Sequence, residues 1–184
     1  MLICGIDEAG RGPLAGPVTA AAVILSFNFP TEILADSKKL SHKKRKAAAT
    51  IIIESGSCFA LGWVWPEEID RINIHNAALC AMERAFDGLS VIPELVLVDG
   101  LYTPCVEVPC KAVVKGDTKV DEIKAASILA KVARDKWMEH YSTMETRYEF
   151  EKHKGYPTKK HKELIQKYGI SAIHRKSFKT GFPS

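Results

Sequence analysis

The stretch GIDEAGRGPLAGPV, residues 5–18, joins two apolar segments through a turn rich in glycine and proline. Residues 2–7 predict a buried strand, and residues 18–25 predict a second strand after the turn. Asp7 and Glu8 therefore stand side by side where the first strand is expected to end. Adjacent side chains of a regular strand point to opposite faces, so the turn must re-aim one of the two carboxylates. Its glycines permit such a bend.

The remainder of the chain alternates between apolar strand patterns and helical patterns. Further strands are expected at residues 58–65, 95–98 and 111–114, and helices at 41–54, from 66, 74–89 and 120–140. The first three strands lie close enough in sequence to pair antiparallel, and the later two alternate with helices and should run parallel to the first. This order predicts one α/β domain over residues 1–184, with a mixed five-stranded sheet flanked by helices. A basic helical extension is expected from about residue 141 to residue 184.

Three of the expected strands end on acidic residues, in the sequences GIDE, LVDG and VVKGD. This places Asp7, Glu8, Asp99 and Asp117 at strand ends, where the sites of open α/β sheets gather. Neighbouring strands lie about 4.8 Å apart, so carboxylates on them can share a cation, and without one they would repel. Oxygen-only ligands favour Mg²⁺ or Mn²⁺, and two such ions about 4 Å apart serve in-line attack at a phosphate. The alternative for each aspartate taken singly is a helix cap or a turn residue.

The net charge of +4 is distributed unevenly along the chain. Residues 152–184 carry nine lysines and arginines and one acidic residue, a net +8, so residues 1–151 sum to −4. A second basic cluster includes Lys38, Lys39 and residues 43–46. An acidic body with a basic tail and a basic patch is compatible with a polyanionic partner, but charge alone favours a solvated surface, because most charged runs are of that kind.

Composition excludes several other classes of protein. No apolar run approaches the length of a membrane span, and the first apolar run is too short and too quickly followed by acids for a secretory signal. The five cysteines are odd in number and include no Cys-x-x-Cys pair, which predicts reduced thiols in a cytoplasmic protein. A zinc site at Cys105 and Cys110 is disfavoured because no second pair has ligand spacing.

Several motifs, taken together, resemble type 2 ribonuclease H, ribonuclease HII. They span nearly the whole chain in the family's order, and the pair DEAGRG and AASILAKVARD is the most specific part of the resemblance. The motifs are DEAGRGPLAGPV (7–18), DSKKLS (36–41), LVDG (97–100), VVKGD (113–117), AASILAKVARD (125–135), HKGYPTKKH (153–161) and HRKSF (174–178). Type 3 enzymes share the acids but carry lysine in the glycine clamp, where this chain has Arg11.

The resemblance implies a ribonuclease H-like fold and a metal-dependent endonuclease. Its substrates would be RNA in RNA–DNA hybrids and ribonucleotides embedded in duplex DNA. The cut would fall on the 5′ side of the ribonucleotide and leave a 3′-hydroxyl and a 5′-phosphate. The family's four metal-binding acids fall on Asp7, Glu8, Asp99 and Asp117, which would hold two Mg²⁺ or Mn²⁺ ions.

The resemblance also assigns the turn of the opening stretch to the substrate. Gly10, Arg11 and Gly12 match the family's clamp on the ribonucleotide, and glycine backbone can approach a 2′-hydroxyl, the group that separates RNA from DNA. Tyr156 matches the tyrosine that stacks on the sugar of the following deoxynucleotide. Without the resemblance, Tyr156 would be read as a turn aromatic that packs under the next helix.

Other basic residues are expected at the rim of the site or in ion pairs. Lys38, Lys39 and the 43–46 cluster are candidates for phosphate contacts, and Lys131 and Arg134 are expected to pair with acids. The segment HRKSF is expected to fold the tail against the body. The chain is expected to act as a monomer, and its final residues KSFKTGFPS show no clear sliding-clamp motif, so a clamp partner stays open.

Two rival functions remain at this stage. A non-catalytic nucleic-acid-binding protein would bind without regard to divalent ions. A nuclease of the same fold acting on plain DNA would cut an all-DNA duplex as readily as a chimeric one.

Overall fold

The computed structural model describes residues 1–34 and 40–181, and within them the chain forms a mixed five-stranded sheet in the order β3-β2-β1-β4-β5. Strand β1 pairs antiparallel with β2 and β2 with β3, whereas β4 runs parallel to β1 and β5 to β4. The predicted pairing directions are therefore confirmed. The strands are β1 (Ile3–Ala9), β2 (Val18–Ile24), β3 (Cys58–Val64), β4 (Leu95–Asp99) and β5 (Cys110–Val113).

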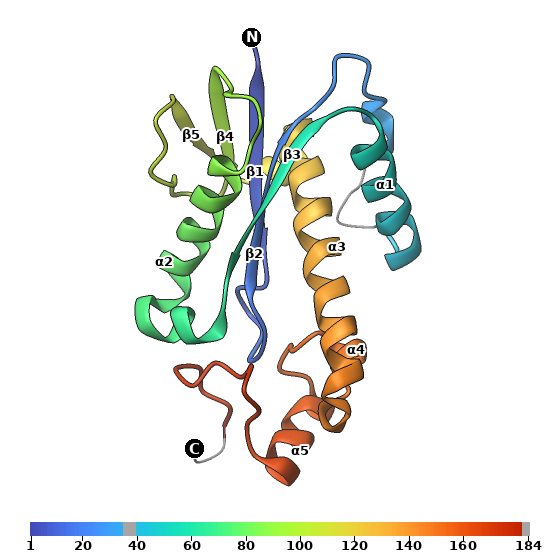
Figure 1. Cartoon of the computed structure of the whole chain (residues 1–184), viewed down its shortest axis with the longest axis vertical. Helices are drawn as coiled ribbons and strands as arrows, with labels where there is room; N and C mark the ends of the chain where they lie inside the picture. The colour runs from blue at the N-terminus through green and yellow to red at the C-terminus, as the bar shows by residue number, and fades with distance from the viewer. Residues whose placement is uncertain (35–39, 182–184) are drawn as a thin grey trace.

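Helices cover both faces of this sheet (Figure 1). Helix α2 packs on one face, and α1 and α3 pack on the other. Because both faces are covered, every residue of β2 is buried. The helices are α1 (His42–Glu54), α2 (Pro66–Asp87), α3 (Asp121–Met144), α4 (Phe150–His153) and α5 (Lys159–Tyr168), with 3-10 turns η1 (Thr31–Leu34), η3 (Gly116–Thr118) and η4 (Thr146–Tyr148).

The helix boundaries follow local signals in the sequence. Ser41 caps α1, and its hydroxyl accepts a hydrogen bond from the Lys44 amide at 3.3 Å. Pro66 opens α2, as predicted. The two helices expected at residues 66 and 74 are the two parts of α2, which is kinked at Asn73, where φ is 67°. The Asn73 side chain caps the second part by accepting from the Asn76 amide at 3.0 Å.

A glycine in β1 brings α3 close to the middle of the sheet. A Cβ atom at Gly5 would lie 2.2 Å from the backbone carbon of Glu122, so a larger residue would push the start of α3 away. The turn η3 leads directly into this end of α3. The close approach at Gly5 therefore places η3 beside the carboxyl ends of β1 and β4.

The C-terminal segment folds back onto the turn between β1 and β2, below the sheet in Figure 1. His174 forms an isolated bridge with Ala15, and the Arg175 amide donates to the Leu14 carbonyl at 2.8 Å. The expectation that the tail folds against the body is confirmed. A separate apolar core joins this segment to α3 and consists of Leu14, Ala15, Met138, Tyr148, Phe150, Leu164, Ile165 and Ile173.

Several boundaries differ from the sequence prediction, among them the ends of β1 and α3. Strand β1 runs to Ala9, because residues 8 and 9 still pair with β2, whereas it was expected to end at Asp7. Helix α3 continues to Met144, past the end expected near residue 140. The five cysteines are all free thiols. Among the described residues, no helix combines the length and the apolar character that crossing a membrane would need.

Candidate active site

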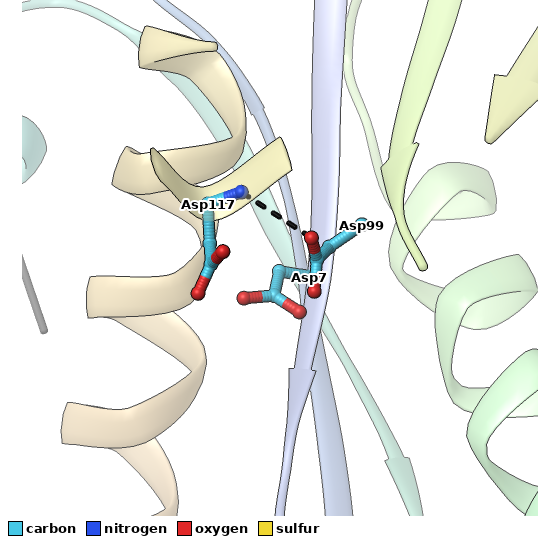
Figure 2. A group of neighbouring side chains, drawn as sticks. All are labelled: Asp7, Asp99 and Asp117. Atoms are coloured by element: carbon cyan, nitrogen blue, oxygen red, sulfur yellow. Dashed lines mark hydrogen bonds between the residues drawn. The ribbon is translucent and has the colours of Figure 1, made fainter. Parts of the chain in front are cut away.

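Three aspartates from three elements meet at the carboxyl ends of β1 and β4 (Figure 2). Asp7 lies in β1, Asp99 ends β4 and Asp117 lies in η3. The parallel register pairs Ile6 with Val98, so the next residues, Asp7 and Asp99, are neighbours across the two strands. The Asp117 amide donates to a carboxylate oxygen of Asp99 at 3.3 Å. One carboxylate oxygen from each aspartate lies within 4.8 Å of the others.

The environment of Asp7 disfavours its charged form. The side chain is 5% exposed, and burial raises the pKa of Asp7 well above its usual value. The negative charges of Glu8 and Asp99 raise this pKa further. Hydrogen bonds from the Ser127 side chain and the Glu8 amide, which lies 2.8 Å from the carboxylate, oppose the shift. Three crowded carboxylates that offer only oxygen ligands are suited to a hard divalent cation.

Glu8 lies beside the three aspartates, and its side chain makes a different contact. Its carboxylate is 3.3 Å from the Arg11 guanidinium, and burial raises its pKa while Arg11 opposes the shift. Within the described part of the chain, the group of carboxylates close enough to share an ion contains Asp7 but not Glu8. Both residues lie inside β1, so the backbone turn expected directly after them begins only at Gly10, where φ is 95°.

A pocket of about 410 Å³ opens beside the aspartates. It brings together the predicted glycine turn, the predicted tyrosine and two of the predicted acids. Its lining consists of Glu8, Ala9, Gly10, Arg11, Gly12, Arg45, Asp117, Ser127, Ile128, Lys131 and Tyr156. The other two residues predicted to bind substrate, Lys38 and Lys39, lie outside the described residues.

Tyr156 faces the glycine turn across this pocket. A Cβ atom at Gly12 would lie 3.8 Å from the Tyr156 ring, an ordinary van der Waals distance, so the two walls of the pocket lie close together. The Lys131 ammonium lies 5.3 Å from the centre of the ring, and the Arg134 guanidinium lies 5.7 Å from it. Tyr156 is half-buried and lines the pocket, which is not the arrangement of an aromatic packed wholly under a helix.

The structure adds two polar pocket residues, Ser127 and Lys131, that sequence analysis did not assign to the site. Arg45 belongs to the 43–46 cluster that was expected to contact phosphates, and it lines the pocket, whereas Lys131 was expected only as a partner for an acid. The latter prediction is confirmed, because Lys131 donates to Asp135 at 2.7 Å. Ser127 was not singled out, although its spacing of four residues from Lys131 places both on one face of α3. The prediction that Arg134 pairs with an acid is wrong, because its guanidinium donates its hydrogen bonds to main-chain carbonyls.

Comparisons with known proteins agree over almost the whole chain. A sequence model of the family described as Ribonuclease HII matches residues 4–181. A Ribonuclease HII of Vibrio vulnificus (strain YJ016) is 52% identical over 177 residues, which cover 96% of this chain and 86% of the relative. A Ribonuclease HII of Vibrio parahaemolyticus is 53% identical over 178 residues, covering 97% of this chain and 84% of the relative.

Solved structures share the fold. The ribonuclease H2 of Pyrococcus horikoshii OT3 superposes with a TM-score of 0.82 at 25% identity, over 98% of this chain and 95% of that one. The RNase HII of Archaeoglobus fulgidus, solved in a complex with PCNA, superposes with a TM-score of 0.80 at 26% identity, over 96% and 94%. With the sequence match and the fold in agreement, the chain belongs to the ribonuclease HII family of hydrolases, the type 2 ribonucleases H.

Proposed function

We propose that this protein is a divalent-metal-dependent endonuclease that cleaves the RNA of RNA–DNA hybrids and incises duplex DNA on the 5′ side of an embedded ribonucleotide. The products would be a 3′-hydroxyl and a 5′-phosphate, and the chain would act as a monomer. Membership of the ribonuclease HII family supports the activity on RNA–DNA substrates. The observation that carries the metal dependence is the convergence of Asp7, Asp99 and Asp117 within 4.8 Å.

The acidic residues would hold the metal ions. Asp7, Asp99 and Asp117 offer oxygen ligands within 4.8 Å of one another, and Glu8 and Asp117 line the adjacent pocket. Bound Mg²⁺ or Mn²⁺ would supply Lewis-acid chemistry, which activates water and stabilises the negative charge of the leaving 3′ oxygen. The protein's contribution is to fix these carboxylates on β1, on the end of β4 and on the turn η3, so that they need not reorganise when substrate arrives.

The basic and glycine-rich walls of the pocket would orient the nucleic acid. Arg45 and Lys131 line the pocket and would attract phosphates of the strand, and Arg11 would hold the phosphate beside the ribonucleotide. The backbone at Gly10 and Gly12 carries no side chain that would keep a sugar 2′-hydroxyl at a distance.

Tyr156 would select for a deoxynucleotide directly after the ribonucleotide. Its half-exposed ring forms the wall opposite Gly12. A flat ring packs against a deoxyribose, whose C2′ carries only hydrogens, and would be crowded by a hydroxyl there. The pocket would thereby favour a ribonucleotide followed by DNA.

The test is incision of a DNA duplex that contains a single ribonucleotide, run beside the same duplex made wholly of DNA. With Mg²⁺ or Mn²⁺ we expect one cut, directly 5′ to the ribonucleotide, and no cut of the all-DNA control. Asp7→Asn should remove cutting and leave duplex binding nearly intact. Absence of incision by a correctly folded protein would refute the proposal, and equal cutting of both duplexes would indicate a plain DNA nuclease.

A further inference from the structure

Two arginines are completely buried behind the glycine turn of the pocket. Arg134 is 0% exposed and Arg175 is 1% exposed. Buried charges in proteins are normally paired with an opposite charge, because desolvation is costly. Burial lowers the pKa of both guanidinium groups, because desolvation disfavours their charged form. Each of the two guanidinium groups is held by three main-chain carbonyls.

Arg175 holds the beginning and the end of the turn between β1 and β2. Its Nη2 donates to the Gly10 carbonyl at 2.6 Å and its Nη1 donates to the Arg11 carbonyl at 3.0 Å. Its Nε donates to the Gly16 carbonyl at 2.9 Å. One planar guanidinium thus fixes three carbonyls of a single turn, and its fork geometry leaves these carbonyls little rotational freedom.

Arg134 holds the same turn from α3 and ties it to the opposite wall. Its Nε donates to the Pro17 carbonyl at 2.8 Å and its Nη2 donates to the Ala15 carbonyl at 3.0 Å. Its Nη1 donates to the Lys154 carbonyl at 3.0 Å, two residues before Tyr156. The glycine turn and the tyrosine wall are therefore attached to one guanidinium group.

The direction of these carbonyls determines the direction of two amides. In a planar trans peptide the N–H points opposite to the C=O of the same unit. The Gly10 carbonyl shares its peptide unit with the Arg11 amide, and the Arg11 carbonyl shares its unit with the Gly12 amide. Since both carbonyls point inward at Arg175, both amides point outward, on the side where these residues line the pocket. The guanidinium charge also polarises both peptide units and makes their amides stronger donors.

Glycine at position 10 is required for this arrangement as well as for approach to a sugar. A Cβ atom there would lie 2.2 Å from Nε of Arg134, and the φ of 95° is unfavourable for other residues. The absence of a side chain at Gly10, on the pocket side, and the position of Arg134, on the buried side, therefore depend on each other.

We propose that Arg134 and Arg175 are positioning residues that set the preference for a ribonucleotide, by fixing the Arg11 and Gly12 amides as hydrogen-bond donors to the 2′ oxygen. The inference rests on the function proposed above. Neither arginine reaches the substrate, and both act through the main chain of the turn. A purely structural role would predict lost stability with the preference for a ribonucleotide unchanged.

The experiment compares the affinity of each protein for two duplexes that differ only in one 2′-hydroxyl. Binding is measured in EDTA, so that neither duplex is cut, and the readout is the ratio of the Kd for the all-DNA duplex to that for the duplex with one ribonucleotide. Arg175→Lys keeps a positive charge and removes the planar guanidinium that binds several carbonyls at once. The ratio of Kd values should therefore fall about tenfold, which corresponds to the free energy of about one hydrogen bond. Arg134→Lys is the second variant, should Arg175→Lys fail to fold.

Arg84→Lys is the matched control. Arg84 also donates to a main-chain carbonyl, that of Trp63 at 2.7 Å, and to Glu68, but it lies outside the pocket. It should lose thermal stability and keep the wild-type ratio. If Arg175→Lys or Arg134→Lys loses stability and also keeps the ratio, the positioning role is wrong. If the wild-type protein itself shows a ratio of one, the proposed preference for ribonucleotides fails first and the inference fails with it.

Discussion

His161 and His174 form a hydrogen bond between their Nε2 atoms, 3.0 Å apart, inside the C-terminal segment. The Nδ1 of His161 lies 2.9 Å from the Tyr156 carbonyl, which can only accept, and the Nδ1 of His174 accepts from the Ser171 amide at 2.8 Å. His161 must therefore donate through Nδ1 and accept through Nε2, and both rings are neutral in this arrangement. The pair connects Tyr156 of the pocket to the residue that precedes Arg175.

This pair predicts that the protein loses stability in acid. Burial, together with the charge of neighbouring histidines, lowers the pKa values of His161 and His174 to about 4. As the pH falls, the unfolded chain binds protons at these two histidines before the folded protein does. The free energy of unfolding therefore has its full value above about pH 6.5 and decreases towards pH 4 by about 1.4 kcal/mol per pH unit for each histidine. Urea unfolding at several pH values measures the slope, which should be smaller in His161→Gln than in wild type.

The exposed His140 provides the control for this slope. His140→Gln should unfold with the wild-type pH dependence. Comparison between variants is needed because the raised pKa values of Asp7 and Glu8 act in the opposite direction, making the folded state bind extra protons. Equal slopes in His161→Gln and wild type would contradict the assignment.

The crowded carboxylates predict that Asp7→Asn stabilises the protein when no metal is bound. Burial and the neighbouring acids raise the pKa of Asp7, so its negative charge destabilises the fold at neutral pH. Removing that charge should raise the Tm in EDTA by about 2–4 °C. Addition of Mn²⁺ should raise the Tm of wild type and have less effect on the variant.

Asp121→Asn is the control for the charge effect, because Asp121 is paired with Lys124 at 2.7 Å on the surface of α3. That variant should not gain stability and should respond to Mn²⁺ as wild type does. A lower Tm for Asp7→Asn in EDTA would show that the Asp7 carboxylate makes a net favourable contribution to folding.

The two glycines of the turn should respond differently to the same substitution. Gly10→Ala places a Cβ atom 2.2 Å from Arg134 at a positive φ, and should cost about 1–3 kcal/mol of folding stability together with most of the incision activity. Gly12→Ala meets its first neighbour at 3.8 Å and should leave the Tm unchanged. Thermal unfolding and single-ribonucleotide incision of both variants separate folding from substrate approach. Equal Tm losses in the two variants would contradict the packing argument.

The predictable part of this molecule depends on local pattern and on rules of strand connection. The apolar run before Asp7 and the one before Asp99 indicated two strands, and the crossover between them made parallel pairing the expectation. Parallel neighbours end at the same edge of a sheet, so the meeting of Asp7 and Asp99 could be anticipated. Ser41 signalled the start of α1 for an equally local reason.

The buried arginines could not be predicted in the same way. Arg175 binds a carbonyl 165 positions earlier in the chain, and Arg134 one 117 positions earlier. The sequence cannot indicate which carbonyl will be the acceptor, because every residue has a main-chain carbonyl. A lysine or arginine on a helix suggests an ion pair instead, and that expectation held for Lys131 with Asp135 and failed for Arg134.

The Lys131–Asp135 pair gives a final prediction, which separates a structural role of Lys131 from its role in the pocket. Asp135 is 4% exposed and accepts from Lys131 at 2.7 Å. Lys131→Gln leaves this carboxylate without its charged partner and should cost about 1–3 kcal/mol in urea unfolding. Adding Asp135→Asn should recover much of that loss, since the two residues are coupled.

Recovery of stability should not restore the binding of nucleic acid. Lys131 lines the pocket, and a contact to phosphate contributes about one unit to the slope of log Kd against log salt. Both Lys131→Gln and the double variant should therefore show a slope smaller by about one, whereas Asp135→Asn alone should keep the wild-type slope. A double variant that regains the wild-type slope along with its stability would show that Lys131 serves only to neutralise Asp135.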